Sequence, residues 1–346
     1  MRALQYDRFG GPLAVIEAPE PILEAGGAIV EVTRTGLCRS DWHGWQGHDS
    51  DTVLPCIPGH EFTGVVRAAP DLPGLVGARV VVPFVMACGR CRDCGAGAGQ
   101  VCRAQRQPGF TDPGSFAERV AVPNAAVNLV PLPDSVRDDA AAALGCRMAT
   151  SWRALTAVAG LQAGERVLVL GAGGVGLAAI QIARAMGAEV TAADISAEAL
   201  RIAESLGAEP IQLTDGMGGE EIAGVVRGRH TDGVDCSLDA LGSPELAAAG
   251  ILALRRQGRH VQVGLLADGW AGLPIGRLIA HELAVLGSHG MAAGDYPPLL
   301  AAVADGRLDP AGLVTEILTL AQAAEALPHM AQPDAPRGVR LIDPRL

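Results

Sequence analysis

The chain has 346 residues, 49% of them hydrophobic and 19% charged, so it can form two domains with a large core and is too apolar to be disordered. All 27 basic residues are Arg, and the net charge of −11 argues against a nucleic-acid partner, which would need a basic face. The N-terminus lacks the apolar segment of a secretory signal, and the longest apolar run, 167–180, is too short to span a bilayer. We therefore expect a cytoplasmic protein with no membrane partner, whose cysteines favour metal binding over disulfides.

The chain has two parts that differ in composition and in the pattern of predicted elements. Residues 1–147 are rich in Pro and Gly, and their short β-branched runs at 28–32 and 78–82 are typical of an irregular all-β lobe. From about residue 150, helical stretches alternate with strand-like runs, which predicts a parallel, doubly wound sheet. These runs lie at 166–170, 189–194, 233–239, 259–265 and 283–288. The predicted fold is thus α/β plus β, with one domain at 1–147, completed by a helical tail and final strand within 291–346, and a second at 148–290.

Four cysteines are closely spaced within residues 88–102. Cys88, Cys91, Cys94 and Cys102 follow the pattern C-x2-C-x2-C-x7-C. Four thiolates can close a tetrahedron around one zinc ion, and such a site holds a loop in place because it leaves no coordination position open. The spacing predicts a structural zinc site.

A glycine-rich turn follows the predicted strand 166–170. It reads Gly171-x-Gly173-Gly174-Val175-Gly176, precedes a predicted helix, and is followed one strand later by Asp194. This order is typical of a dinucleotide site, in which the glycines let the backbone approach a pyrophosphate. A carboxylate at Asp194 would bind the adenosine ribose and repel a 2′-phosphate, so the sequence favours NAD over NADP.

A second metal site can be drawn from Cys38, His60 and Cys146, which lie in three separate segments. Two thiolates and one imidazole are a ligand set for catalytic zinc, whose fourth position stays open for water or substrate. Glu61 could be an exchangeable ligand or support the site, and Asp41 could accept the other N–H of His60. Each residue also has an ordinary interpretation, as a buried thiol or a surface pair.

Several segments together resemble medium-chain, zinc-dependent alcohol dehydrogenases over essentially the whole chain. They are Gly36–His43, Gly59–Gly64, the four cysteines, Gly145–Arg147 and Gly171–Gly176. The resemblance implies a GroES-like catalytic domain and a Rossmann NAD domain, with the active site in the cleft between them. It also implies two zinc ions per chain, with Cys38, His60 and Cys146 binding the catalytic one.

The resemblance assigns further roles. Ser40 would take the substrate proton, which would pass through the NAD ribose to His43 and out to water. Arg39 and Arg340 would meet the cofactor pyrophosphate. The positions that line the substrate pocket correspond to Ser40, Trp42 or Trp45, Phe84 and Leu265, the last of which we also count with the cofactor-binding residues. The small Ser40 leaves room for a medium-sized apolar alcohol, although both Trp side chains could simply pack the lobe.

Some positions depart from the family pattern. Ala199 stands where many members carry a Lys that binds the ribose, and Ala78 follows Gly77 where the pattern has Asp. The interval from Cys38 to Cys146 resembles the tetrameric bacterial and yeast group, so we expect a homotetramer, with a dimer as the alternative. A polyol or L-threonine dehydrogenase and a non-catalytic NAD-binding protein stay open as functions, whereas a zinc-free reductase would not need the Cys38, His60 and Cys146 set.

Overall fold

The computed structural model describes residues 1–266, 272–332 and 335–346. Two compact units divide the chain: one comprises Met1–Ala149 and Gly290–Leu346, and the other Thr150–His289. The sequence placed these limits at 147/148 and 290/291. We describe each unit by itself.

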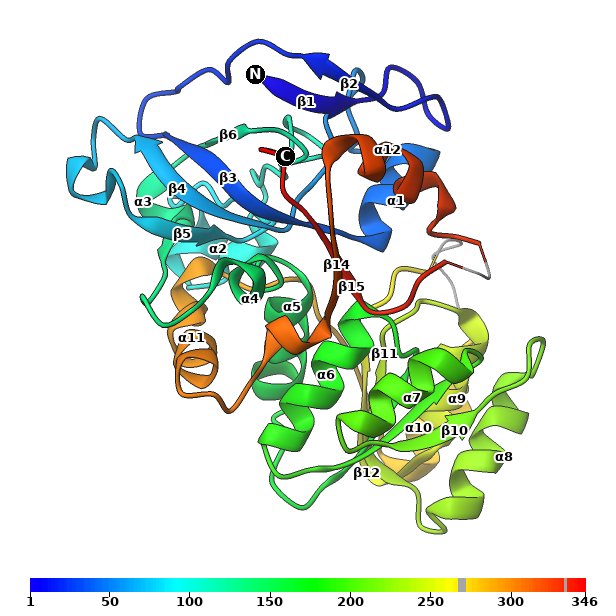
Figure 1. The fold of residues 1–346 in the computed structure, drawn as a ribbon. Helices are drawn as coiled ribbons and strands as arrows, with labels where there is room; N and C mark the ends of the chain where they lie inside the picture. The colour runs from blue at the N-terminus through cyan, green and yellow to red at the C-terminus, as the bar shows by residue number, and fades with distance from the viewer. Residues whose placement is uncertain (267–271, 333–334) are drawn as a thin grey trace. The chain divides into compact units, whose positions relative to one another are not determined.

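The elements follow one another along the chain as labelled in Figure 1. The strands are β1 (Arg2–Gln5), β2 (Ala14–Glu17), β3 (Ala28–Leu37), β4 (Phe62–Ala68), β5 (Arg79–Val82), β6 (Arg119–Val122), β7 (Val130–Pro131), β8 (Arg166–Leu170), β9 (Glu189–Asp194), β10 (Glu209–Gln212), β11 (Val234–Asp239), β12 (Leu254–Gln262), β13 (Ala284–Gly287), β14 (Val314–Leu318) and β15 (Val339–Ile342). The helices are α1 (Arg39–Gln46), α2 (Arg92–Gly95), α3 (Ala125–Asn128), α4 (Asp138–Ala142), α5 (Arg147–Arg153), α6 (Gly174–Ala185), α7 (Ala197–Ser205), α8 (Gly219–Arg229), α9 (Pro244–Leu252), α10 (Ile275–His281), α11 (Tyr296–Ala304) and α12 (Leu320–His329).

The first unit is built on a seven-stranded sheet in the order β14-β15-β3-β4-β5-β7, with β6 also paired to β3. The strand β15 pairs antiparallel with β3, so the chain's tail returns to the first lobe as predicted. The expectation of an all-β lobe is wrong, because α1, α2, α3 and α4 also lie within residues 1–147. Of these, α1 follows β3 directly and carries several of the site residues. Figure 1 shows α12, near the end of the chain, beside α1, and the two helices are in contact.

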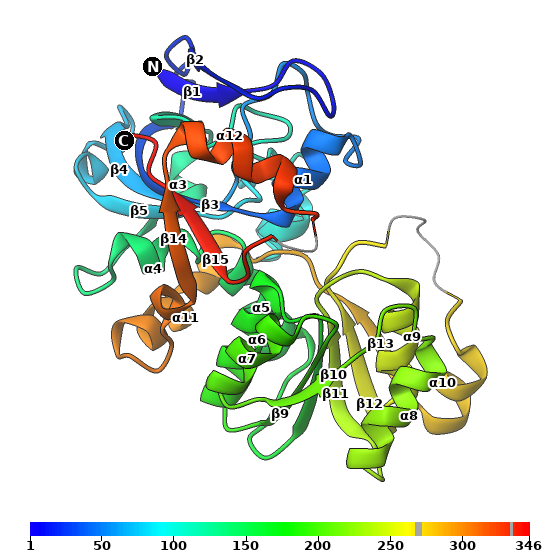
Figure 2. The ribbon, with the colours of Figure 1, turned by 45° about the vertical axis from the view of Figure 1, so that its right-hand side comes forward.

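The second unit has a parallel six-stranded sheet in the order β10-β9-β8-β11-β12-β13. The strand β8 is a continuous apolar run whose residues Val167–Leu170 are fully buried, as expected for a parallel strand covered on both faces. In Figure 2, α6 and α7 lie on one face of this sheet and α8, α9 and α10 on the other. The doubly wound arrangement predicted from the sequence is confirmed, and β8 and β9 have the predicted bounds.

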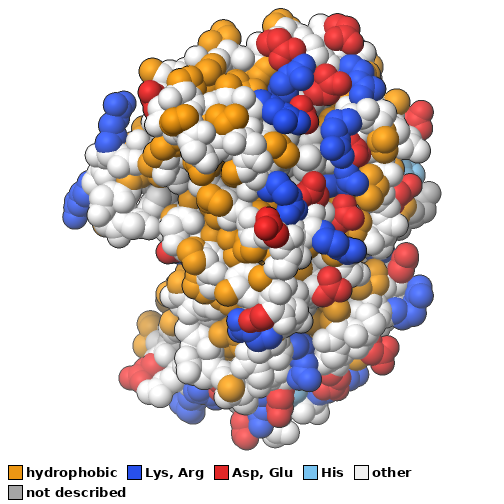
Figure 3. All heavy atoms as spheres, turned by 60° about the vertical axis from the view of Figure 1, so that its left-hand side comes forward, with side chains coloured by type: hydrophobic (Ala, Val, Ile, Leu, Met, Phe, Trp, Pro, Cys, Tyr) orange, Lys and Arg blue, Asp and Glu red, His pale blue; other side chains and the backbone are white. Residues whose placement is uncertain are grey.

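Charges of both signs are interspersed on one face of the molecule. On the face shown in Figure 3, Arg side chains lie beside Asp and Glu side chains instead of forming a continuous basic area. Ion pairs such as Arg106–Asp112 and Arg119–Glu20 join side chains of opposite charge. Every helix in the described part of the chain is too short or too polar to cross a membrane.

Candidate active site

The structure brings Cys38, His60 and Cys146 together from three segments of the first unit. Their ligand atoms all lie within 4.8 Å of one another, and all three residues are buried. A hydrogen bond with Cys146 holds the pKa of the Cys38 thiol well below its usual value, and the positive charge of Arg147 acts in the same direction. Cys38 is therefore favoured as a thiolate, the form of cysteine that binds metal, while the same hydrogen bond raises the pKa of Cys146.

Asp41 orients the imidazole of His60. His60 Nδ1 donates to Asp41 Oδ1 over 2.8 Å, and the same carboxylate accepts the N–H groups of Cys38 and Gly59. Among the described residues, His60 Nε2 is buried and has no hydrogen-bond partner. A buried imidazole nitrogen facing two cysteines needs a partner, and a zinc ion satisfies its lone pair. The residues therefore fit a zinc ion.

Glu61, next to His60 in sequence, pairs with Arg147. The carboxylate accepts the backbone N–H of Arg147 over 2.8 Å and lies 3.1 Å from its guanidinium. Both side chains are buried, and burial raises the pKa of Glu61 to about 7 against the lowering effect of Arg147. A side chain at Gly36 would collide with Glu61, because its Cβ would lie 2.2 Å from Oε2. The sequence analysis gave Arg147 no role, although it follows Cys146 directly.

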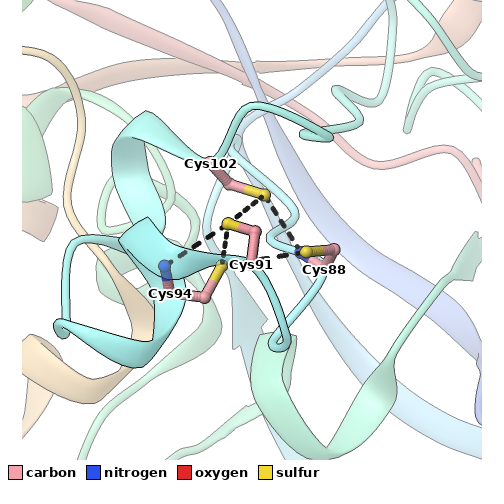
Figure 4. Close-up of side chains that lie close together, drawn as sticks. All are labelled: Cys88, Cys91, Cys94 and Cys102. Carbon is pink, nitrogen blue, oxygen red and sulfur yellow. Dashed lines mark hydrogen bonds between the residues drawn. The ribbon is translucent and has the colours of Figure 1, made fainter.

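The four cysteines at 88–102 converge as Figure 4 shows. Sulfur atoms are 3.5 Å apart between Cys91 and Cys94, 3.8 Å between Cys91 and Cys102, and 4.0 Å between Cys88 and Cys94. Four Zn–S bonds of about 2.3 Å form a tetrahedron with an edge of about 3.8 Å, so the spacing suits zinc. The backbone N–H of Cys94 donates to Cys91 Sγ and lowers the pKa of that thiol to about 6.

The glycine-rich turn of the second unit fits a pyrophosphate. A Cβ at Gly176 would lie 1.8 Å from the carbonyl oxygen of Gly171, so only glycine allows this close approach of turn and helix. The N-cap of α6, Gly173, offers no side-chain cap, which leaves the first N–H groups of the helix available to an anion. Gly174 and Val175 belong to this first turn. Asp194, at the end of β9, accepts the N–H groups of Ala172 and Ser196 over 2.7 Å each.

The residues expected to move a proton lie on α1. Ser40 Oγ is 3.9 Å from Cys38 Sγ, which places its hydroxyl beside the metal cluster. His43 is half-buried, and its Nδ1 lies 3.0 Å from Nδ1 of the exposed His48. The pKa of His43 is lowered, mainly by burial and also by the charges of Arg39 and His48. No part in the proton path was assigned to His48 from the sequence, so this contact was missed.

The two expected pyrophosphate ligands differ in their surroundings. Arg39 donates to the carbonyl of Met330 over 2.9 Å and stacks on Trp42, 4.6 Å from the ring centroid. Arg340 is only 7% exposed, and burial lowers its pKa. The described residues offer its guanidinium no hydrogen bond or ion pair, only the more distant charge of Glu316. A buried cation of this kind suits an anionic ligand.

The expected pocket residues lie in different surroundings. Phe84 packs edge-on against His60, with ring centroids 6.1 Å apart, and Phe110, which the sequence analysis did not single out, lies 5.4 Å from the same ring. Trp45 is in the core: it is 8% exposed and donates its indole N–H to Gly11. Trp42 is partly buried at the same core cluster. Leu265, in the second unit, is 79% exposed.

Comparison with known proteins identifies the family. Residues 24–134 match the family model of an alcohol dehydrogenase GroES-like domain, and residues 174–305 match that of a zinc-binding dehydrogenase. An alcohol dehydrogenase of Geobacillus stearothermophilus is 31% identical over 312 residues, which are 89% of this chain and 90% of that protein. An L-threonine 3-dehydrogenase of Streptomyces coelicolor is 32% identical over 330 residues, 91% of this chain and 92% of that protein.

A solved structure of an alcohol dehydrogenase from Thermus sp. ATN1 superposes with a TM-score of 0.89 at 30% identity, covering 99% of both chains. The chain therefore belongs to the medium-chain, zinc-dependent alcohol dehydrogenase family. The resemblance inferred from the sequence is confirmed.

Proposed function

We propose that this protein oxidises a primary or secondary alcohol to an aldehyde or ketone with hydride transfer to NAD, and catalyses the reverse reduction. The observation that carries the proposal is the buried, unpartnered His60 Nε2 facing Cys38 and Cys146. Three ligands of this type leave one position of a zinc ion open for substrate. The family supports the same reaction.

The residues around the metal have separate tasks in this proposal. Cys38, His60 and Cys146 hold the zinc ion, which supplies a Lewis acid that lowers the pKa of the substrate hydroxyl. Asp41 keeps the proton of His60 on Nδ1 and so leaves Nε2 free to bind metal. Arg147 balances the charge of Glu61 and of the two thiols in a buried site. Cys88, Cys91, Cys94 and Cys102 hold a second zinc ion that serves structure alone.

Ser40 and His43 form the proton path of the proposal. Ser40 takes the substrate proton, because its hydroxyl is both donor and acceptor and lies beside Cys38. His43 carries the proton to water. Its lowered pKa suits this task, since an imidazole that holds its proton weakly releases it readily near neutral pH.

The cofactor residues favour NAD. The uncapped N-terminus of α6 offers N–H groups to the pyrophosphate, and Arg39 and Arg340 offer guanidinium groups, which suit phosphate oxygens. Asp194 already accepts two backbone N–H groups and has further lone pairs for ribose hydroxyls. Its charge opposes a 2′-phosphate, so we expect at least a tenfold preference for NAD over NADP.

The substrate we propose is a medium-sized apolar alcohol. Phe84 and Phe110 give the surroundings of His60 an aromatic character, and Ser40 is small. The test is NADH formation with ethanol, 2-propanol, hexanol, benzyl alcohol, cyclohexanol, sorbitol and threonine, each with and without a strong chelator. Chelator-sensitive turnover that is fastest with hexanol or benzyl alcohol is the expected result, and a higher kcat/KM for ethanol would contradict the substrate class.

The alternatives give different results in the same assay. Turnover that is best with threonine or sorbitol would assign the chain to a neighbouring activity, as the similarity to a threonine dehydrogenase allows. NAD binding without any turnover, in protein that holds one zinc ion lost on Cys91→Ser but not on Cys38→Ser, would indicate a non-catalytic NAD-binding protein.

The assembly and the compartment stay predictions. Exposed apolar residues occur on α10 and on the edge strand β13 of the second unit, among them Ile275, Ile279 and Val285. Such residues at a sheet edge are suited to contact another copy. We expect a homotetramer by light scattering, with a dimer as the alternative, and recovery in the cytoplasmic fraction of cells.

A further inference from the structure

The end of α1 folds His48 back onto His43. Gly47 follows the helix with φ of 78°, a left-handed conformation that glycine adopts without strain. The N–H of Gly47 then bonds to the carbonyl of Gly44 and the N–H of His48 to that of His43, which is the hydrogen-bond pattern of a helix C-terminus closed by glycine. The backbone thus fixes the two histidines next to each other.

The side chains of the two histidines meet at their nitrogens. The two Nδ1 atoms are 3.0 Å apart, so one proton lies between them, and the ring centroids are 5.3 Å apart. Trp42 packs edge-on against both rings, with centroid distances of 4.9 and 5.6 Å, and itself lies under Arg39. This packing restricts the rotation of both imidazole rings and keeps the two Nδ1 atoms next to each other.

The two histidines also differ in their exposure to solvent. His43 is half-buried and His48 is exposed, so a proton that passes from one to the other moves toward solvent. The Nδ1 of His43 is used by His48, which leaves its Nε2 for the proton path proposed above. The charges of Arg39 and His48 lower the pKa of His43, while those of Cys38 and Asp49 act in the opposite direction.

We propose that His48 is the outer carrier of the proton path, receiving at Nδ1 the proton that leaves His43. This inference rests on the proposed function, because it extends the path that begins at Ser40. His48 touches neither substrate nor metal and acts through His43, so it is a positioning residue that also hands the proton on.

The transfer conserves the number of protons and the charge on the two histidines. His43 gains a proton at Nε2 and becomes an imidazolium. The Nδ1–H bond of His43 breaks while the lone pair of His48 Nδ1 forms a new N–H bond. His48 then loses its Nε2 proton to water, so one proton enters, one leaves and no charge remains. Both imidazoles recover their starting tautomers by exchange with water.

The test compares the wild type with His48→Gln, which keeps a hydrogen-bonding side chain but cannot carry a proton, and with His48→Phe, which keeps a ring against Trp42. Ser50→Ala, an exposed change in the same segment, is the matched control. Proton release after mixing enzyme with NAD and alcohol is followed by stopped flow with a pH-indicator dye in weak buffer. Both His48 variants should release the proton about threefold to tenfold more slowly, since water replaces only part of a positioned base.

Added imidazole should restore the rate in both variants, whereas a purely structural role would not respond to it. Unchanged release in His48→Gln and His48→Phe, or slow release that imidazole does not restore, would overturn the proposal. If the wild type itself forms no NADH with any alcohol, the proposed function fails; if the wild type turns over normally and the variants match it, only the role of His48 fails.

A second readout needs neither zinc nor turnover. The pKa of His43, followed by NMR titration of its imidazole, should rise in His48→Gln because the positive charge shared with His48 is removed. An identical His43 titration in wild type and His48→Gln would show that the two rings do not share a proton in solution and would contradict the proposal.

Discussion

The carboxylate of Asp41 holds His60 through a 2.8 Å hydrogen bond between Oδ1 and Nδ1, and neither side chain is more than 2% exposed. The same carboxylate accepts the N–H of Cys38, the N-cap of α1, and that of Gly59. One carboxylate therefore connects two of the three residues of the metal cluster and fixes which nitrogen of His60 can bind metal.

We expect Asp41→Asn to weaken zinc binding at this cluster. An asparagine has one acceptor oxygen for three N–H donors, so at least one donor loses its partner and the His60 ring loses its orientation. Loss of such a supporting carboxylate lowers metal affinity about 10-fold to 100-fold. Zinc content after dialysis against a graded chelator measures the effect, with the exposed Asp51→Asn as control. Equal zinc retention in both variants would show that Asp41 does not support the metal.

Two zinc ions per chain are expected, and they should separate by mutation. Cys91→Ser should remove the ion of the four-cysteine site and lower the Tm by roughly 5–10 °C, because binding of a structural ion contributes directly to folding. Cys38→Ser should remove the other ion and abolish turnover with a smaller change in Tm. Elemental analysis, turnover and thermal unfolding of both variants check this. Loss of both ions from either variant would show that the two sites are not independent.

Asp194→Asn should reduce the preference for NAD about tenfold. The amide removes the charge that opposes a 2′-phosphate, and it keeps only one acceptor for the N–H groups of Ala172 and Ser196. We therefore expect kcat/KM with NAD to fall, mostly through KM, and kcat/KM with NADP to rise or hold. The two values, measured with one alcohol, give the ratio. An unchanged ratio would mean that Asp194 does not select the cofactor.

His260 should make the second unit sensitive to acid. It is 1% exposed, lies 2.8 Å from Ser237 Oγ and 3.1 Å from Gln262 Oε1, and burial lowers its pKa below the usual value of about 6.5. His260 binds a proton more readily in the unfolded chain than in the folded one. The contribution of neutral, buried His260 to the free energy of unfolding is therefore complete above about pH 6.5 and is lost as the pH falls.

The slope for one such group is at most about 1.4 kcal/mol per pH unit. The free energies of unfolding of the wild type and His260→Gln, measured between about pH 8 and pH 5, isolate the contribution of His260. The other titrating groups are common to both proteins. The wild type should lose its advantage over the variant in acid. Parallel curves would exclude His260 as the source.

Local patterns in the sequence determined much of this protein. The four cysteines lie within one short segment, so their spacing alone predicts that they can meet around one ion. The glycine-rich turn between β8 and α6 and the position of Asp194 follow from the alternation of strand and helix, because parallel strands place their carboxyl ends at one edge. Two of the strands that were not named from the sequence, β10 and β14, are edge strands of their sheets, and β10 contains Pro210.

Only the tertiary structure decided how distant residues meet. Cys38 follows β3, His60 precedes β4 and Cys146 precedes α5, so the three residues meet only when these segments come together on folding. The pairing of Glu61 with Arg147 likewise appears only in the folded chain. Trp45 lies in the core although it stands beside the site in sequence, since helical geometry turns it to the inner face of α1. His48 meets His43 through the left-handed Gly47. The spacing of residues along the chain predicts local geometry. The burial of a side chain and its contact partners depend on distant segments that come together only on folding.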